Sequence, residues 1–356
     1  ADMEFATPPE ICEAIKKRVE KRIFGYSCVY SDDYYQAFSA WCRKMYDWDF
    51  PKEELTFSPG IIPALYQLLE SLLTKNEKVL MVAPAYGYFQ HAAEYNCVEY
   101  VCSDLKIDKN GYFTIDFDDF AKKAADPLVK LVLWCNPHNP SGRMWTEEEL
   151  KRVAEIVEKH NLWLISDEIH CDIIRNGRKH IPMGKVMPDY GKLITCMSAS
   201  KTFNLAGLQA SNIWIPDAAV RENFQAELDR IGYFELNTMA VIACQAAYES
   251  GAEWLEQCKA YLRGNLDYLR EFLRTRLPQL RLIEPEGTYF AWVDCSGLGL
   301  DSYALNDLIL HKAKLWLDAG HIFGKAWAQY QRIVLACPRS TLEKALTQLE
   351  GAIQTL

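Results

Sequence analysis

Four polar stretches directly follow short apolar segments of the sequence. The stretches contain Gly60, Asn139, Asp167 and Lys201, one in each. If the apolar segments are parallel strands, these residues lie beyond the carboxyl ends of the strands, where ligands bind in open α/β folds. Each residue alone has an ordinary structural explanation, such as a turn, an ion pair or an exposed lysine. The chemistry that we infer depends on all four meeting at one edge of a sheet.

The four residue types match the needs of pyridoxal 5′-phosphate (PLP), a cofactor that requires an amine, an acid, a hydrogen-bond donor, an aromatic ring and a phosphate site. We expect Lys201 to supply the amine and to act as nucleophile and base. We expect Asp167 to keep the pyridine nitrogen protonated, and Asn139 to donate to the phenolic oxygen. Tyr86 offers a ring that would stack on the cofactor, and its alternative role is ordinary core packing.

The phosphate group of such a cofactor requires donors of its own. The backbone N–H groups of Gly60, Ile61 and Ile62 begin a predicted helix, and helix N-termini bind anions. We expect the Ser198 hydroxyl to join them. Ser200 is a weaker candidate for the same contact.

The elements that must position these residues alternate between short apolar runs and helices, which is the pattern of an α/β fold. The runs are apolar throughout, as expected for strands that helices cover on both faces of a mainly parallel sheet. The predicted strands span residues 55–58, 79–83, 98–102, 130–135, 162–166 and 193–197.

Helix signals stand between and around these strands. Thr7, followed by Pro8 and Glu10, predicts a helix over residues 8–24 that stops at Gly25. Thr146 with Glu149 forms a capping box. Beyond residue 217 the sequence predicts long helices over 217–230, 237–250 and 252–277, and then strands at 281–284 and 289–294. We interpret this change of pattern as the start of a second domain.

Composition excludes several classes of protein. The 356 residues, 49% hydrophobic and 24% charged, are typical of a folded chain with two domains. The net charge of -9 disfavours nucleic acid as a partner, and no apolar stretch reaches the ~20 residues of a membrane span. The 12 cysteines include no Cys-x-x-Cys pair, which favours reduced thiols in the cytoplasm. No second ligand lies at metal-binding spacing from His170 except the adjacent Cys171, so we predict no metal site.

Several motifs, in this order along nearly the whole chain, resemble the MalY/PatB group of cystathionine β-lyases, which are fold-type I PLP enzymes. The motifs are Ala1 to Phe5, Phe24 to Tyr26, Pro84 to Tyr86, Asn136 to Gly142, Asp167 to His170, Ser198 to Lys201 and Cys337 to Ser340. The resemblance implies a mixed, mostly parallel seven-stranded sheet in a large domain over residues 45–245. It also implies a smaller α/β domain made of residues 1–44 and 246–356, and a homodimer.

The same resemblance assigns further residues. Arg339 is expected to bind the substrate α-carboxylate, and Tyr26 to reach the active site of the neighbouring subunit. His170 is expected beside the cofactor, where related aminotransferases often carry Tyr. Gln209 replaces an arginine with which those aminotransferases hold the phosphate, so hydroxyl and backbone groups must do more of that work here.

The resemblance implies a carbon–sulfur (C–S) β-lyase that cleaves cystathionine or related S-substituted cysteines to a thiol, pyruvate and ammonia. Lys201 is expected to take the Cα proton, and Lys201 or Tyr86 to protonate the departing sulfur. An aminotransferase of the same fold is the alternative, because it would share every cofactor residue. Two other readings are weaker: a Ser-x-x-Lys acyl-transfer site from Ser198 to Lys201, which lacks its partner motifs, and a binding protein without catalysis.

Overall fold

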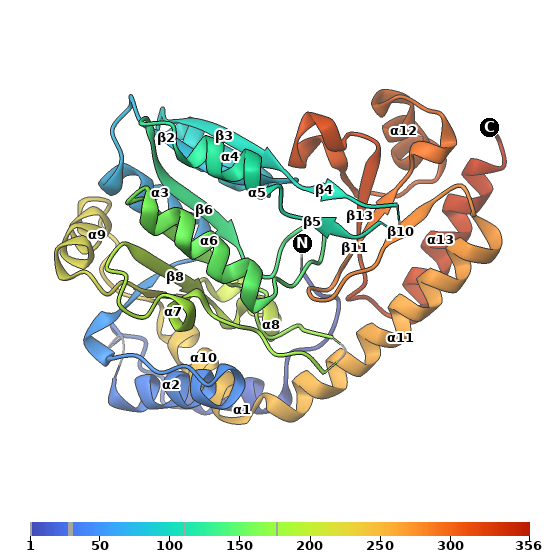
Figure 1. Ribbon diagram of the computed structural model, residues 1–356. Coiled ribbons are helices and arrows are strands. Elements are labelled where there is room, and N and C mark those ends of the chain that lie inside the picture. Colours follow the sequence, from blue (N-terminus) through green and yellow to red (C-terminus); the bar gives the residue numbers. More distant parts are fainter. Residues whose placement is uncertain (1, 28–30, 110, 176) are drawn as a thin grey trace.

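The computed structural model describes residues 2–27, 31–109, 111–175 and 177–356, in which two sheets lie side by side (Figure 1). The larger sheet has seven strands in the order β1-β9-β8-β7-β6-β2-β3. Its strands are β1 (Leu55–Ser58), β2 (Lys78–Ala83), β3 (Glu99–Asp104), β6 (Val129–Cys135), β7 (Trp163–Asp167), β8 (Leu193–Met197) and β9 (Ser211–Trp214).

Five neighbouring strands of this sheet, from β3 to β8, run parallel. Strand β9 runs antiparallel to both β8 and β1. The predicted mixed, mostly parallel sheet of seven strands is therefore confirmed. All six predicted strands are present; β9 is the added one, and it escapes the apolar pattern because Ser211 and Asn212 make up half of its length.

Two groups of helices accompany the large sheet. In the first group α3 contacts α4 and α9, and α6 contacts α5 and α7; in the second, α10 contacts α1, α2 and α8. Figure 1 shows α1, α2 and α10 together below the sheet. The helices are α1 (Pro9–Glu20), α2 (Asp32–Tyr46), α3 (Ile61–Leu72), α4 (Gly87–Tyr95), α5 (Phe117–Ala124), α6 (Glu147–Lys159), α7 (Met183–Val186), α8 (Ala199–Thr202), α9 (Ala218–Arg230) and α10 (Thr238–Ser250).

The smaller sheet is antiparallel throughout and has the order β10-β11-β13-β12. Its strands are β10 (Arg281–Ile283), β11 (Phe290–Asp294), β12 (Asp318–Ala319) and β13 (Tyr330–Val334). Three helices belong to this part of the chain: α11 (Ala252–Arg276), α12 (Ser302–Asp307) and α13 (Arg339–Ile353). Helix α11 contacts α10 at one side and β10 and α13 at the other, so it joins the two parts of the molecule.

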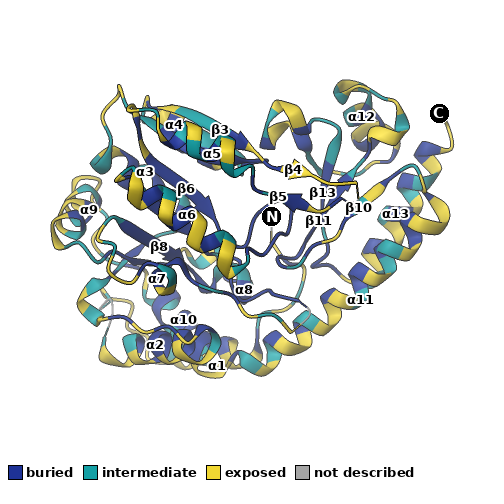
Figure 2. Cartoon of the chain, in the orientation of Figure 1, coloured by how far each residue is buried: buried dark blue, intermediate teal, exposed yellow. Residues whose placement is uncertain are grey.

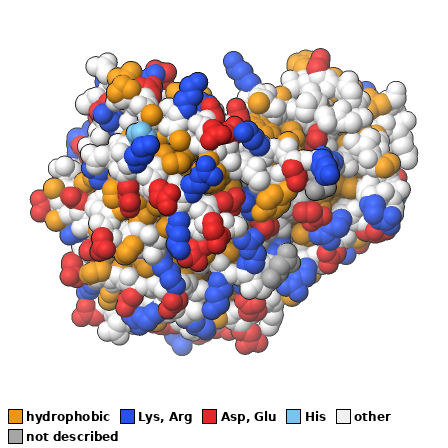
Figure 3. Space-filling view, viewed as in Figure 1, with side chains coloured by type: hydrophobic (Ala, Val, Ile, Leu, Met, Phe, Trp, Pro, Cys, Tyr) orange, Lys and Arg blue, Asp and Glu red, His pale blue; other side chains and the backbone are white. Residues whose placement is uncertain are grey.

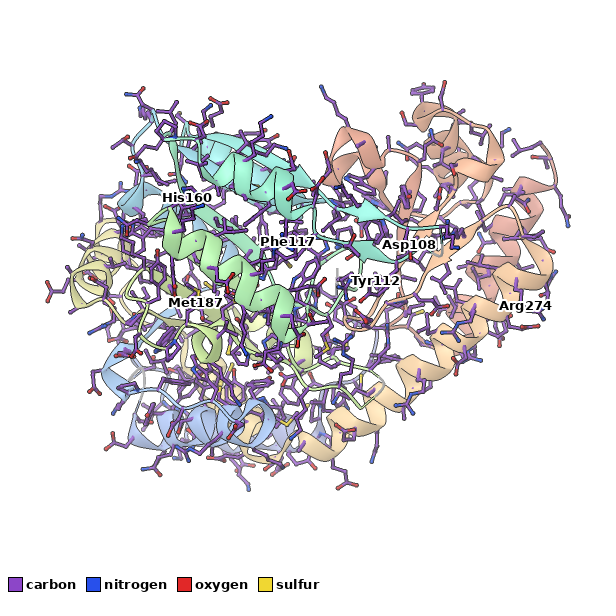
Figure 4. The ribbon with its side chains drawn as sticks, in the orientation of Figure 1. Asp108, Tyr112, Phe117, His160, Met187 and Arg274 are labelled. Carbon is purple, nitrogen blue, oxygen red and sulfur yellow. The ribbon has the colours of Figure 1, made fainter. Side chains whose placement is uncertain are left out.

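A short hairpin from the large part reaches the small sheet. It consists of β4 (Lys106–Ile107) and β5 (Phe113–Thr114), and Figure 4 shows Asp108 and Tyr112 of its turn beside β10. The Arg281 side chain of β10 donates to the Lys109 carbonyl oxygen at 2.8 Å. The Arg143 guanidinium lies over the Tyr112 ring at 4.3 Å.

Buried apolar side chains form two clusters, one for each sheet, and Figure 2 shows the inner strands β6 and β8 dark with burial. Helices α1 and α2 contribute Ile11, Phe38 and Trp41 to the first cluster, because their apolar faces meet α10. This packing differs from the predicted grouping of residues 1–44 with the C-terminal part; of that segment only Met3 is buried in the second cluster. Helix α11 enters both clusters, with Leu255 in the first and Cys258 in the second.

Helix ends differ from the sequence in detail. The predicted helix over 8–24 ends at Glu20, and Ile23 and Phe24 beyond it are exposed. The capping box at Thr146 is confirmed, with both reciprocal hydrogen bonds to Glu149 present. Within the described residues no helix combines the length and the apolar character that a membrane crossing needs. Figure 3 shows acidic and basic side chains intermixed over the visible face.

Candidate active site

A cavity of about 260 Å³ lies where the carboxyl ends of β6, β7 and β8 meet the start of α3. The small sheet closes it with Phe290 of β11 and Arg332 of β13. Nine of the predicted site residues line this cavity: Gly60, Ile61, Ile62, Tyr86, Asn139, Asp167, His170, Ser200 and Lys201. The structure thus brings together residues that are far apart in the sequence, at the edge where strand order predicts a ligand.

Lys201 lies on the short helix α8, directly after β8. The Ser198 hydroxyl caps this helix by accepting from the Ser200 N–H at 3.1 Å. The Lys201 side chain is 21% exposed, and its Nζ lies 3.0 Å from Oδ1 of Asp2. A primary amine therefore sits in the cavity wall with a carboxylate beside it.

Asp167 is the last residue of β7 and points into the cavity floor. Its Oδ1 accepts from the Ile169 N–H at 3.1 Å. Burial raises the pKa of Asp167 from 3.8 to about 7, against the opposing effect of that hydrogen bond. A cationic partner such as a protonated ring nitrogen would favour the ionised form of this carboxyl.

His170 follows on the same loop and is neutral in this setting. Burial lowers the pKa of His170 well below 6.5, and the nearby positive charge of Lys201 acts in the same direction. Its ring meets the edges of Tyr289 and Phe290, at centroid distances of 5.5 and 5.3 Å. Within the described part of the chain Nδ1 of His170 is buried without a hydrogen-bond partner. This nitrogen could bond a ligand atom, since buried polar atoms are normally paired.

Asn139 and Arg332 meet across the cavity. Nη1 of Arg332 donates to Oδ1 of Asn139 at 2.7 Å, which leaves the amide nitrogen of Asn139 as the donor. Asp318 fixes the other edge of the guanidinium by accepting from Nη2 at 2.6 Å and from Nε at 3.1 Å. The guanidinium lies over the Phe290 ring at 4.1 Å. Arg332 is therefore held rigidly at the cavity wall.

The opposite end of the cavity offers donors for an anion. Gly60 is the N-cap of the 12-residue helix α3, and no side chain caps that helix start. Its first turn contains no acidic residue, so its N–H groups and the helix dipole favour an anion there. Ser200, Gln209 and Ser211 line the cavity as well.

Tyr86 is the N-cap of α4 and lines the cavity, with its ring centroid 5.8 Å from that of Phe89. Burial raises the pKa of Tyr86 to about 12, although Arg332 opposes the shift. The hydroxyl is thus protonated at neutral pH and can donate. The ring is placed both for packing and for contact with a ligand.

Comparison with known proteins identifies the family. The model of the family "Aminotransferase class I and II" matches residues 1–349. The chain belongs to this family.

Members of the aminotransferase class I and II family that are similar to this chain include lyases. Cystathionine beta-lyase PatB of Bacillus subtilis is 36% identical over 99% of this chain and 91% of its own length. The PLP-bound C-S lyase of Staphylococcus hominis is 40% identical, covers 99% of this chain and 90% of its own, and has a TM-score of 0.94. Cystalysin of Treponema denticola, which contains PLP, is 32% identical with a TM-score of 0.97, over 100% of this chain and 90% of its own.

Arg339, which was expected to bind the substrate, is absent from the cavity lining. Arg339 is the first residue of α13, where its Nε donates to Oδ1 of Asn265 at 2.9 Å and its guanidinium covers the Tyr268 ring at 4.8 Å. Both contacts turn it toward α11. The cavity-lining arginine is Arg332 instead, which corrects the expectation for Arg339. Arg332 lies on the face of β13 opposite to Gln331 and Ile333, because side chains alternate along a strand. An arginine directly before the apolar run 333–336 is the signal that could have found it.

Two further expectations need correction or a different reading. Ser198 is absent from the cavity lining, because its hydroxyl donates to the Ala210 carbonyl oxygen at 2.7 Å and is used up in the cap of α8. Ser200, the weaker candidate, lines the cavity, as does Ser211, which the sequence did not single out. Tyr26 is 88% exposed and lies on a neighbouring surface hollow, whose wall shares Gln209 with the cavity.

Proposed function

We propose that this protein is a PLP-dependent C–S β-lyase, which converts cystathionine or related S-substituted cysteines to a thiol, pyruvate and ammonia. The observation that carries the proposal is the meeting of Lys201, Asp167, Asn139 and Arg332 around one cavity. Relatives named as cystathionine beta-lyase and C-S lyase over nearly the full length support it.

The residues present fit PLP. Three features of the cavity would contact the ring, the ring nitrogen and the phosphate in turn: Nδ1 of His170, the buried carboxyl of Asp167 and the uncapped start of α3. Lys201 would hold the cofactor covalently, and Asn139 would donate to its phenolic oxygen. Gly60, Ile61 and Ile62, with Ser200 and Ser211, would hold the phosphate. Bound PLP supplies an electron sink that makes the Cα proton of an amino acid acidic.

The chain's own groups then divide the work. Arg332 offers a planar fork, preset by Asp318 and Phe290, to the substrate carboxylate. Nζ of Lys201, once free, removes the Cα proton. Either Lys201 or the protonated Tyr86 hydroxyl gives a proton to the departing sulfur, because the pKa of Tyr86 is about 12. The small sheet, through Phe290 and Arg332, excludes water from the reacting atoms.

The substrate side of the cavity favours neutral groups on sulfur. Among its described lining residues Arg332 is the only arginine, so a second carboxylate would meet no equivalent partner. The aromatic side chains of Tyr86 and Phe290 also line the cavity. We therefore propose that S-substituents without a net negative charge are cleaved best.

We also propose a homodimer in the cytoplasm. The exposed Tyr26 and Gln209 line the same surface hollow, and Gln209 also lines the cavity. A second subunit bound at this hollow would therefore lie next to the cavity. The eleven cysteines within the described residues are all free thiols, which suits a reducing compartment.

The proposal is tested by incubating PLP-loaded protein with L-cystathionine and measuring pyruvate and free thiol. We expect both products from the parent and neither from Lys201→Ala, which keeps the cavity but lacks the amine. Transfer of the amino group to a keto acid without release of thiol would establish the alternative, an aminotransferase. Failure of the parent to bind PLP would overturn the cofactor assignment.

A further inference from the structure

A short segment at the start of the described chain, residues 2–7, crosses between the two parts of the molecule; we call it the strap. Its end at Thr7 is fixed to the large part, since the Thr7 hydroxyl donates to the Phe203 carbonyl oxygen at 2.8 Å. The Asn204 side chain donates to the Phe5 carbonyl oxygen at 2.8 Å. Phe203 and Asn204 directly follow α8, so the strap is tied to the element that carries Lys201.

The other end of the strap is fixed to the small part. Met3 is 6% exposed and belongs to the cluster of the small sheet. The Glu4 N–H donates to the Ala336 carbonyl oxygen at 2.7 Å, and the Phe5 ring packs edge-on against Tyr261 at 5.2 Å. Figure 1 shows this end of the chain between the two parts. The backbone on the C-terminal side of Asp2 is therefore held by both parts of the molecule.

This anchoring sets the Asp2 carboxylate against the reacting amine, with Oδ1 of Asp2 3.0 Å from Nζ of Lys201. The hydrogen bond from Lys201 holds the pKa of Asp2 below 3.8, so the carboxylate is ionised at neutral pH. We propose that Asp2 is a catalytic residue whose carboxylate is the counter-ion of the Lys201 ammonium whenever Lys201 is not bonded to the cofactor. This inference rests on the proposed function, since it concerns the same reaction.

The other charged and titratable groups near Lys201 cannot take this part. Asp167, on β7, is assigned to the ring nitrogen. His170, on the loop after β7, is neutral because burial lowers its pKa. Arg332 on β13 is positive and Tyr86, with a pKa of about 12, is uncharged. Among these groups Asp2 is the one that places a negative charge within hydrogen-bond distance of Nζ of Lys201.

The proton balance of the step defines what Asp2 does. When the neutral amine of Lys201 takes the Cα proton, the C–H bond breaks, its electron pair stays with the substrate, and an N–H bond forms on Nζ. The new positive charge lies against the Asp2 carboxylate, which accepts a hydrogen bond and does not take the proton. The proton remains on Lys201 until it passes to the departing sulfur or to water.

The expected effect is moderate, because the Asp2 side chain is 65% exposed and exposed ion pairs are screened by water. Anchoring by Met3 and Glu4 removes part of the entropy cost that weakens most surface pairs. A pair of this kind supports a change of about 3-fold in the reactivity of the Lys201 amine.

The experiment begins with the full chain freed of PLP. Each variant reacts with trinitrobenzenesulfonate near pH 8, and mass spectrometry of the Lys201 peptide gives the labelling rate. Only neutral amines react, so loss of the counter-ion in Asp2→Asn is expected to raise that rate about 3-fold at low salt, with a smaller difference at high salt. Asp2→Glu should restore the parent rate. Glu4→Gln, which removes a carboxylate from the same strap, is the matched control and should leave it unchanged.

PLP-loaded protein supplies the second readout. We expect Asp2→Asn to lower kcat for pyruvate release about 3-fold or more with little change in KM, because the interaction forms with the transferred proton. An unchanged labelling rate in Asp2→Asn overturns the ion pair, and an unchanged kcat overturns its catalytic part. If the parent releases no pyruvate, the proposed lyase function fails while the labelling rates still measure the pair.

Discussion

Asp167 illustrates how one side chain couples ligand chemistry to stability. Its pKa is about 7 in the folded chain against 3.8 ordinarily, so the folded protein holds this proton at pH values where the unfolded chain has released it. The stabilisation that comes from the neutral form is complete below pH 3.8 and is lost as the pH rises through about 7. At neutral pH, partial ionisation of the buried Asp167 therefore lowers the free energy of unfolding of the cofactor-free protein, and a bound cation would offset this loss.

The first prediction concerns Asp167→Asn in cofactor-free protein. Asn cannot ionise, so raising the pH should destabilise only the parent at this position. The difference in free energy of unfolding between variant and parent should therefore be greater at pH 8 than at pH 5, by about 2 kcal/mol. Urea unfolding at the two pH values measures this difference. Asp189→Asn, which alters an exposed carboxylate, serves as control. A difference between parent and Asp167→Asn that is the same at both pH values would contradict the prediction.

The second prediction separates the two arginines. Arg332→Lys keeps the charge but loses the fork that Asp318 and Phe290 hold in place, so KM for L-cystathionine should rise about 10-fold or more. Arg339→Lys should change KM less than about twofold, since Arg339 contacts Asn265 and Tyr268 outside the cavity. Steady-state kinetics on PLP-loaded proteins decide between them. The reverse pattern would restore the role first expected of Arg339.

For single residues, the sequence predicted which residue types form the site better than it predicted where individual side chains point. Lys201, Asp167 and Asn139 follow strands, and strand ends converge whatever the details of packing. Arg332 and Arg339 are seven residues apart, and only the pairing of β13 with β11 and the start of α13 decide which one faces the cavity. Ser198 was overvalued because a sequence does not reveal that its hydroxyl is consumed by Ala210 and the cap of α8.

At the scale of elements, the loop after β6 is fastened to the segment that leads into β11. The Gly142 carbonyl oxygen accepts from the N–H groups of Glu286 and Gly287, at 2.8 and 2.9 Å. Arg143, buried beside it, pairs with Glu149 at 2.7 Å and with Glu286. This fastening holds the loop of Asn139 against the small sheet.

The third prediction tests how close that approach is. Gly142 has φ of +71°, and a Cβ there would lie 2.5 Å from Cβ of Pro285. Gly142→Ala should destabilise the protein by about 1–2 kcal/mol for the positive φ and by about 1–3 kcal/mol more for the collision. Gly177, with φ of +69° and open space around it, is the matched control, and Gly177→Ala should show only the first cost. Equal losses in urea unfolding would exclude the collision.

A buried carboxyl group joins its own loop to two helices. Asp172, 4% exposed, accepts from Nε1 of Trp41 at 3.0 Å and from the Thr202 hydroxyl at 2.7 Å. The Tyr46 hydroxyl also donates to it. It therefore ties α2 and the loop of His170 to α8, next to Lys201.

The fourth prediction is that Asp172→Ala lowers the free energy of unfolding by about 3 kcal/mol or more, because it removes the acceptor of three buried donors and leaves Trp41 and Thr202 without one. Asp172→Asn keeps the shape and one acceptor oxygen, so its loss should be about half as large. Urea unfolding of both variants measures the difference. A loss below about 1 kcal/mol in Asp172→Ala would mean that water replaces the carboxylate.

Strands were easier to predict than helix ends. Apolar runs identify buried parallel strands because every side chain in them is covered, whereas β9 carries Ser211 and Asn212 and depends on its neighbours β1 and β8 for recognition. Helix α1 ends at Glu20 because nothing covers Ile23 and Phe24 within the described chain. Periodicity alone carries no information about where such cover ends.

For the whole molecule, an exposed apolar surface points to self-association. Phe24 and Tyr26 lie beside Phe234, which is 56% exposed, and hydrogen bonds from Ser27 to Leu236 and from Thr238 to Gly25 fix the two segments together. A continuous surface of this kind is typical of a protein interface.

The fifth prediction is that the protein is a dimer and that Phe234→Asp converts it to a monomer, because a charge would be buried in the contact. Light scattering after size-exclusion chromatography gives the mass of each variant. Trp316→Asp is the control, since Trp316 is 92% exposed on the small part, away from this surface. A Phe234→Asp protein that keeps the dimer mass would place the interface elsewhere.

The helix that joins the two parts, α11, also determines how they can move. Only its first turn, at Leu255, packs in the large cluster, while from Cys258 onward it packs in the small one. With 25 residues it is a rod of about 38 Å. A rigid rotation of this helix by roughly 5° about its first turn would displace its far end by about 3 Å. Asn265, near the middle of α11, donates to the carbonyl oxygens of Leu335 and Cys337 just after β13. Such a rotation would therefore move the strand that carries Arg332 less than it moves the far end of the helix.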